Sequence, residues 1–562
     1  MHDPQQIQQA LEEITALFAF REGAKFKAQA YARAAELIEG WAADLSRLVE
    51  SGRLTALEGI GPSLEKQIVA LWNTGTSPLL EELRAETPPG AFALSRLPGL
   101  TPRRIRALSE GLGIRSLEDL REACVAQRVR TLAGFGPKVE QKLTEALAKQ
   151  AEAGALPARL LLSEARPVAA RLVAGLAETG FTAHVAGALR RGEETVDAIE
   201  LVVVASPARA YAAVEALADV VQVDAASGRG LLTVGMPLQV HAADAERAGA
   251  ALLLATGSAE HLAQLGARSE GGLAPLVAHA ADEPALYRAL GLAPVPPELR
   301  QGTDELARAA TQSFDDLVTE DAIRGFVHCH TTYSDGRHDI EAMARAAEAR
   351  GMAYITITDH SPTARYAGGV DHDRLLRQWD EIDRVQARVT IRILRGTESD
   401  ILADGSLDYP DEVLDRLDVV IASVHARYRL DPKDMTARLV RAMKLPLFKI
   451  WGHALGRLLL RRAPIDCDVP AVLDALASSR GAIEINGDPR RLDLPPRWIP
   501  EARARGIPFV LSVDAHSTDG LGVLPYAVTM ARRGGLTRAE VLNTLDADAF
   551  CAKVAPRVGG AA

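Results

Sequence analysis

The sequence predicts a multidomain protein, with an all-α region first, an α+β domain in the middle and a distorted α/β (βα)-barrel at the C-terminus. Three observations support this prediction. The chain has 562 residues, which is too long for a single hydrophobic core. Three glycine turns, each followed by the start of a helix, recur before residue 150. From about residue 322, short apolar runs alternate with helical segments, and many of these runs end in histidine or an acid.

The first region contains three similar glycine turns, LEGIGPSLEKQI (57–68), LPGLTPRRIRAL (97–108) and LAGFGPKVEQKL (132–143). Glycine lets the backbone approach a ligand closely, and free N–H groups at a helix start attract phosphate. One such turn also ends ordinary helices, but three in succession resemble the helix-hairpin-helix motif, which binds the DNA backbone without recognising bases. The resemblance implies salt-sensitive, sequence-independent DNA binding. The candidate DNA-binding residues are Gly59, Gly61, Gly99, Gly134, Gly136 and Lys138.

Ahead of these turns, AKFKAQAYARAAELI (24–38) predicts a helix. Its expected apolar stripe is Phe26, Ala30, Ala34 and Ile38. The order of helix and turns is similar to the N-terminal region of family X DNA polymerases. This resemblance implies a DNA-end-binding domain over 1–85 and a fingers-like helix-hairpin-helix domain over 86–152.

The middle segment AGALRRGEETVDAIELVVV (186–204) resembles the family X palm motif, Gly-Ser-x-Arg-Arg followed by a strand with Asp-x-Asp. In that family three carboxylates hold the two Mg²⁺ ions of nucleotidyl transfer. Gly187, Arg190 and Arg191 match the motif. Ala188 stands where the motif has serine, and Ala198, Glu200 and His241 stand where the family has its three aspartates. We therefore expect residues 153–318 to keep a nucleotidyltransferase-like palm and thumb, with no Mg²⁺ in the palm and no polymerase activity.

The C-terminal region, 322–562, has metal-binding side chains at the ends of its apolar runs. In FVHCHTTYSDG, His328 and His330 would project from one face of a strand, and an acid follows. Any one of these histidines could be an ordinary core residue, but six of the 13 in the chain end predicted strands here. Imidazole and carboxylate ligands suit zinc, manganese or iron. The candidate ligands are His328, His330, Asp335, His360, Glu398, His425, His453, Asp514 and His516.

The ordered set HxH, TDH, GTE, SVH, GH and DAH resembles the PHP (polymerase and histidinol phosphatase) phosphoesterase family. Phrases such as TESDILADGSLDYPDEVL and INGDPRRLDL are similar to the C-terminal domain of bacterial family X polymerases. The resemblance implies two or three divalent ions, Mn²⁺ or Zn²⁺, with Glu398, Asp514 and His328 as catalytic residues. The three implied ligand groups are His328, His330, Glu398 and Asp514, then Glu398, His425 and His453, then Asp335, His360 and His516.

These features predict a metal-dependent phosphodiesterase that acts as a 3′→5′ exonuclease and trims or repairs DNA ends. The resemblance also implies cleavage at abasic sites and cleaning of blocked 3′ ends. One alternative is a gap-filling DNA polymerase with PHP proofreading, which the replacement of the three palm aspartates by Ala198, Glu200 and His241 argues against. Another is a small-molecule phosphatase, which the three DNA-binding turns argue against. Basic residues that could steer a phosphodiester backbone are Arg427, Arg457, Arg461 and Arg491.

The composition excludes several other classes of protein. The net charge is −10 and no apolar stretch approaches the roughly 20 residues of a membrane helix. The polar N-terminus, MHDPQQIQQALEEI, does not resemble a signal peptide. Four cysteines without CxxC spacing indicate neither a disulfide framework nor a thiolate zinc site. We expect a cytoplasmic monomer that binds gapped, nicked or 3′-ended duplex DNA and no membrane.

Overall fold

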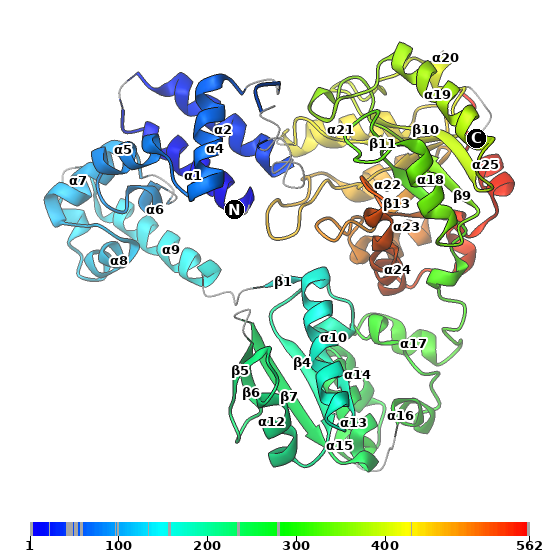
Figure 1. Ribbon diagram of the computed structural model, residues 1–562. Helices are drawn as coiled ribbons and strands as arrows, with labels where there is room; N and C mark the ends of the chain where they lie inside the picture. The colour runs from blue at the N-terminus through cyan, green and yellow to red at the C-terminus, as the bar shows by residue number, and fades with distance from the viewer. Residues whose placement is uncertain are drawn as a thin grey trace. The chain divides into compact units, whose positions relative to one another are not determined.

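The computed structural model describes residues 4–558 except 22, 41–48, 50–53, 57–59, 96, 98–99, 133, 155–158, 233–235, 278–281 and 429. The chain forms two compact units, residues 1–157 and 158–562 (Figure 1). The finer division into four domains stays a prediction. Among the residues that the structure describes, no helix is both long enough and apolar enough to cross a membrane.

The first unit is helical, as predicted. Its helices are α1 (Pro4–Phe18), α2 (Lys25–Gly40), α4 (Pro62–Thr74), α5 (Pro78–Glu86), α6 (Ala91–Ser95), α7 (Pro102–Leu112), α8 (Leu117–Val125) and α9 (Pro137–Gly154). Helices α4, α7 and α9 each begin with proline directly after one of the three predicted turns, and proline fits this position because its missing N–H has no partner there. The core of the unit includes Leu11, Ile14, Ile68, Leu71 and Leu108.

The predicted apolar stripe of the helix at 24–38 is wrong at its first residue, because Phe26 is 85% exposed. The buried face of α2 instead contains Tyr31, Ala34 and Ala35, and the Tyr31 ring lies 5.4 Å from the ring of Phe18 in α1. A strict four-residue spacing drifts by about 40° per step around a helix of 3.6 residues per turn. Two such steps rotate Phe26 away from the face that contains Ala34.

The second unit begins with a mixed five-stranded sheet in the order β2-β4-β7-β6-β5. Its strands are β2 (Ala183–Val185), β4 (Ile199–Val204), β5 (Val220–Val223), β6 (Arg229–Leu232) and β7 (Pro237–Ala243). Only β4 and β7 are parallel among these pairs. The sheet is accompanied by α10 (Leu162–Glu178), α11 (Gly187–Arg190), α12 (Pro207–Glu215) and α13 (Ala248–Thr256). A helical segment follows, with α14 (Ala259–Ala267), α15 (Leu273–Val277), α16 (Glu283–Ala289) and α17 (Glu305–Ala309).

The rest of the second unit is a seven-stranded parallel sheet in sequential order, coloured green to red in Figure 1. Its strands are β8 (Gly325–Cys329), β9 (Tyr354–Ile357), β10 (Arg392–Asp400), β11 (Val419–Ser423), β12 (Lys449–Trp451), β13 (Gly481–Asn486) and β14 (Phe509–Ser512). A bridge between Cys329 and Ala515 brings the first and last strands together, so the barrel is nearly closed. This confirms the predicted distorted (βα)-barrel, and it brings the carboxyl ends of the strands to one rim.

The outer helices of the barrel alternate with its strands. They are α18 (Ile340–Glu348), α19 (His372–Gln386), α20 (Asp411–Leu414), α21 (Pro432–Met443), α22 (Val469–Ala477), α23 (Ile499–Ala504), α24 (Leu524–Arg533) and α25 (Ala547–Val554). The strands β8, β9, β11, β12 and β14 are buried along their whole length. Burial on both faces explains why these strands are continuous apolar runs in the sequence.

A set of ion pairs joins the mixed-sheet domain to the barrel. Arg533 of α24 pairs with Glu193 and Glu194, which follow α11, and Arg457 of the barrel also contacts Glu194. Burial alone would raise the pKa of Glu194, but Arg533 and Arg457 outweigh it and lower the pKa to about 2. We call these contacts of Glu193, Glu194, Arg457 and Arg533 the interdomain ion pairs. They fix the loop after α11 against the barrel.

Candidate functional site

All nine predicted ligands lie at the carboxyl-end rim of the barrel. His328 is in β8 and Glu398 is in β10, and the other seven follow β8, β9, β11, β12 and β14. The β8 strand changes register between Phe326 and Cys329, and His328 between them has a left-handed φ of +68°. His453 and Asp514 also have positive φ, at +23° and +48°. Such backbone is costly for residues other than glycine and is typical of functional sites.

The first ligand group brings four side chains together. His328 Nε2 lies 3.3 Å from Glu398 Oε2 and 3.6 Å from Asp514 Oδ1. His330 Nε2 lies 3.7 Å and 3.3 Å from the same two oxygens. Bonds of about 2.0–2.1 Å to a tetrahedral ion separate the ligand atoms by about 3.4 Å. His328, His330 and Asp514 offer ligand atoms within 4.8 Å of one another and could hold one divalent ion, and Glu398 Oε2 lies beside both imidazoles.

The second group shares Glu398 with the first. Its other oxygen, Oε1, lies 3.2 Å from His425 Nε2 and 2.8 Å from His453 Nε2. The two imidazole nitrogens are 3.3 Å apart. Glu398 thus offers one oxygen to each of two groups, which is the arrangement of a bridging carboxylate.

The third group is more open. Asp335 Oδ2 lies 3.6 Å from His360 Nε2 and 3.4 Å from His516 Nε2. The His516 side chain is 39% exposed, whereas that of His328 is fully buried. This group is the more exposed end of the cluster, which we call its mouth.

The buried nitrogens support a metal centre. His328 Nε2, both ring nitrogens of His330 and His360 Nδ1 are buried and have no hydrogen-bond partner. An unsatisfied buried polar atom is costly, so these lone pairs require a ligand. Burial and the neighbouring His516 lower the pKa of His330 to about 4, which keeps this ring neutral and able to bind metal. Nitrogen and oxygen ligands of this kind suit several divalent ions.

Two acids that sequence reasoning missed orient the imidazoles. His328 Nδ1 lies 2.5 Å from Glu484 of β13, and His425 Nδ1 is in short contact with Asp400 at the end of β10. A carboxylate on one ring nitrogen directs the other toward a metal. The sequence contained one signal that could have identified them, namely an acid within an apolar strand: Glu484 in GAIEING and Asp400 in RGTESDI.

Among the predicted steering arginines, Arg491 lies at the cluster. Its Nε is 3.4 Å from Asp514 Oδ2, and both Nε and Nη1 are buried without a hydrogen-bond partner. Arg457 is only 6% exposed and donates to the carbonyl oxygen of Arg491 as well as pairing with Glu194. Arg491 therefore presents a positive charge to the site, whereas Arg457 holds the surrounding loop.

The palm-like residues lie together in the mixed sheet. Glu200 of β4 and His241 of β7 are on adjacent parallel strands, with Glu200 Oε2 2.9 Å from His241 Nε2. Gly187 has φ +63°, and a Cβ there would lie 2.2 Å from Glu200 Oε1. The Glu200 carboxylate thus lies between Gly187 and His241. Ala198 precedes β4 and Ala188 is in α11, and neither offers a ligand atom.

The predicted DNA-binding turns are described in part, because Gly59 and Gly99 lie outside the described residues. The carbonyls of Gly61, Thr101 and Gly136 each accept the first backbone hydrogen bonds of α4, α7 and α9. In the middle turn, the Thr101 side chain also accepts from the N–H of Arg104. The three helices are therefore begun in the same way by the residue before their first proline.

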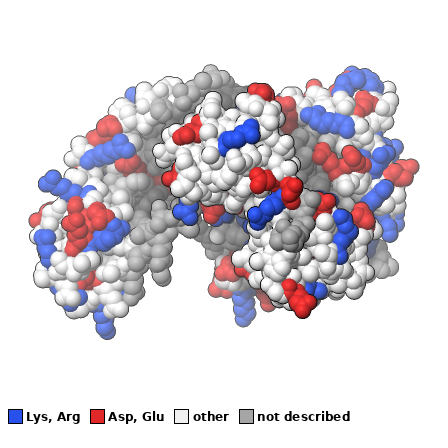
Figure 2. Space-filling model, turned by 90° about the horizontal axis from the view of Figure 1, so that it is seen from below, with Lys and Arg blue, Asp and Glu red and all other residues white. Residues whose placement is uncertain are grey.

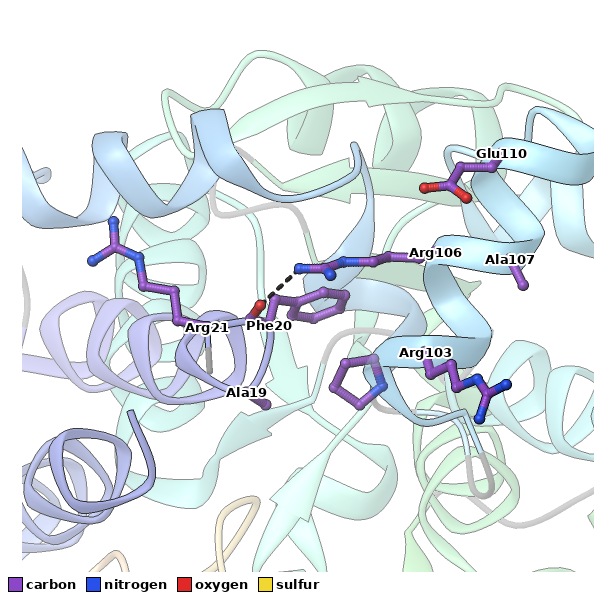
Figure 3. Close-up of a pocket in the computed structure, with 8 residues that line it drawn as sticks. Ala19, Phe20, Arg21, Arg103, Arg106, Ala107 and Glu110 are labelled. Atoms are coloured by element: carbon purple, nitrogen blue, oxygen red, sulfur yellow. Dashed lines mark hydrogen bonds between the residues drawn. The ribbon is translucent and has the colours of Figure 1, made fainter. Parts of the chain in front are cut away.

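A hollow of about 460 Å³ lies beside the start of α7 (Figure 3). Arg106 donates to the carbonyl of Phe20, and Arg21 is paired with Glu82 and Glu86, whereas Arg103 is exposed. On the face in Figure 2, basic and acidic side chains are interspersed. This face therefore shows no patch of one sign of charge among the residues that the structure describes.

Replacing Lys138 with alanine should weaken the binding of all duplex sequences alike, because this exposed side chain at the start of α9 would contact only phosphate. The slope of log affinity against log salt should fall by about 1. Lys142→Ala, one turn further along α9, is the matched control and should have a smaller effect. Fluorescence anisotropy with two unrelated duplexes at several salt concentrations measures both. A loss confined to one sequence would contradict this role.

Comparisons with known proteins agree with the predicted motifs. The helix-hairpin-helix domain family matches residues 2–77, the SAM-like helix-hairpin-helix tandem family matches 92–149 and the PHP domain family matches 327–486. A Bacillus subtilis (strain 168) protein named "DNA polymerase/3'-5' exonuclease PolX" is 33% identical over 96% of this chain and 98% of its own length. A probable phosphatase of Acetivibrio thermocellus is 34% identical over 39% of this chain and 89% of its own length. A probable phosphatase of Thermoanaerobacter sp. (strain X514) is 29% identical over the same shares.

Proposed function

The chain belongs to the bacterial family X DNA polymerases of the PolX type, which combine DNA polymerase and 3′-5′ exonuclease, and from this premise we propose that its barrel hydrolyses DNA from the 3′ end. The observation that carries the proposal is the gathering of the nine predicted ligands at one rim, where eight form three overlapping groups and His453 contacts the central carboxylate of Glu398. The two helix-hairpin-helix regions and the full-length likeness support DNA as the substrate.

Each residue of the site has a role in this proposal. Bound divalent ions would supply an activated water and neutralise the charge on the phosphate. Glu398 sets the spacing between the first two ligand groups, and Glu484 and Asp400 direct His328 and His425 into them. Arg491, whose Nε forms an ion pair with Asp514 and whose Nη1 makes no hydrogen bond, would contact a non-bridging phosphate oxygen and stabilise the negative charge that develops there.

We further propose that the mixed-sheet domain no longer performs nucleotidyl transfer. The hydrogen bond between His241 and Glu200 supports this, since it joins two positions where magnesium would need separate carboxylates. The comparisons favour the alternative, because the full-length Bacillus relative is named as a polymerase as well as an exonuclease. That alternative is a gap-filling polymerase with PHP proofreading.

One assay separates these hypotheses. The purified full-length protein is incubated with Mn²⁺ and a 5′-labelled primer–template, with and without the four dNTPs. We expect the primer to shorten in both conditions, with activity lost in EDTA. Extension with dNTPs would establish the polymerase alternative. An intact primer together with phosphate release from a small phosphate monoester would instead favour a phosphatase, the activity in the names of the partial relatives.

A further inference from the structure

The segment 361–369, between β9 and α19, forms a closed loop over the mouth of the metal centre. It leaves the ligand His360 and returns to it, since the N–H of Val370 donates to the carbonyl of His360 over 2.8 Å. At the start of the loop, the N–H of Ser361 donates to the carbonyl of Glu398 over 3.0 Å. The loop is therefore attached at both ends to the metal-binding residues.

Side chains from outside the loop fix its shape. Arg374 of α19 donates to the carbonyl of Gly368 over 2.7 Å, and Asp408 accepts from the N–H of Thr363 over 2.6 Å. The chain closes tightly, because a Cβ on Gly369 would lie 2.3 Å from the carbonyl oxygen of Ser361. A loop held in this way presents its side chains in defined positions before any substrate binds.

The residue that this loop presents at the mouth is Tyr366. Its ring centroid lies 5.9 Å from that of His360, at an interplanar angle of 61°, and 6.1 Å from that of His425. The side chain is nevertheless 41% exposed. An aromatic ring that packs against two predicted ligand histidines and remains partly open to solvent offers a surface to a bound molecule.

We propose that Tyr366 stacks on the base of the 3′-terminal nucleotide, so that the nuclease acts on an unpaired 3′ end. This inference rests on the proposed exonuclease function. The base of a nucleotide lies one sugar away from its phosphate, so a phosphate at the cluster places its base near the rim. Aromatic stacking accepts any base, since every base has a π-face.

The consequence concerns the choice of substrate. A paired 3′-terminal nucleotide must leave the duplex before its phosphate can reach the cluster, because the central carboxylate of Glu398 is only 1% exposed. Removing it from the duplex costs free energy, and this cost is smallest at a mismatched, frayed or single-stranded end. Stacking on Tyr366 therefore favours mispaired 3′ termini over paired ones, and this preference does not depend on the sequence of the DNA.

The test compares two single-stranded oligonucleotides that differ only at the 3′-terminal residue. One ends in a normal nucleotide and the other in an abasic tetrahydrofuran residue, so the terminal phosphodiester is the same. With the full-length protein and Mn²⁺, Tyr366→Ala should raise KM for the normal end about tenfold, equivalent to about 1.4 kcal/mol. KM for the abasic end should change less than twofold. Tyr366→Phe, which keeps the ring, should restore the affinity for the normal end.

A second measurement does not depend on hydrolysis. A 3′-terminal 2-aminopurine should lose fluorescence when the unmodified protein or Tyr366→Phe binds it in EDTA, and should not do so with Tyr366→Ala. The stacking role of Tyr366 would be overturned if Tyr366→Ala raised KM equally for the normal and the abasic ends. It would also be overturned if Tyr366→Phe showed the same defect as Tyr366→Ala. If neither oligonucleotide is cleaved by the unmodified protein, the exonuclease proposal fails, and the 2-aminopurine signal still decides the stacking.

Discussion

Replacing Glu398 with glutamine should lower the rate of phosphodiester hydrolysis by on the order of a thousandfold. The side chain is 1% exposed, and its two oxygens approach five imidazoles, four of them from the first two ligand groups. Glutamine has the same shape, but its amide is uncharged and its NH₂ end cannot bind a cation. A single substitution should therefore impair both groups at once, and the bound metal should fall by more than one ion per chain.

The measurements for Glu398→Gln are hydrolysis of a 3′-labelled oligonucleotide and metal analysis of the purified protein. Glu412→Gln, at an exposed position in α20, is the matched control and should behave as the unmodified protein. Circular dichroism and DNA affinity report whether the variant is folded. Unchanged hydrolysis with unchanged metal content in a folded variant would refute the bridging role.

The unmodified protein should incorporate no dNTP, and the triple substitution Ala198→Asp, Glu200→Asp, His241→Asp should recover little incorporation. The variant would place three aspartates in the palm, two of them new acids and one a shortened Glu200, but Ala188 would still lack the hydroxyl expected to hold the nucleotide phosphates. Adding Ala188→Ser to the triple variant tests this explanation, since the fourfold variant should then exceed the triple one. Each palm variant also carries Glu398→Gln, so that hydrolysis by the barrel does not degrade the primer during the assay.

Primer extension on a gapped template measures the outcome. Incorporation by a protein with the natural palm residues, abolished by Glu200→Ala and not by His328→Ala, would refute the inactive palm. Such a result would show that Glu200 binds magnesium in spite of its contact with His241, and it would support the alternative that the comparisons favour.

The fold class and the ligand set were predictable from sequence because both depend on short local patterns. Strand ends in a parallel barrel share one rim, so an apolar run that ends in histidine or an acid predicts where its side chain lies. The alternation at His328 and His330 is such a pattern. The turns before α4, α7 and α9 are another, since a glycine or threonine followed by proline predicts a helix start.

The remaining features depend on contacts between distant residues. Glu484 contacts His328 across 156 positions of the chain, a distance set by the barrel register and not by any local spacing. Tyr366 lies in a segment without periodicity, and its position depends on Arg374 and Asp408 from other elements. At Phe26 a local pattern misled the prediction. The four-residue spacing suggested a buried side chain, but the side chain is exposed to solvent.

The interdomain ion pairs bear on how the chain can evolve. A deletion that removed the mixed-sheet domain would also remove Glu193 and Glu194, the acids that face Arg457 and Arg533. Arg457 and Arg533 would both lose these partners, so the ion pairs make the stability of the barrel depend on the mixed-sheet domain, whatever chemistry that domain performs. A domain can thus persist in a lineage as a structural support after its chemistry has ceased to matter.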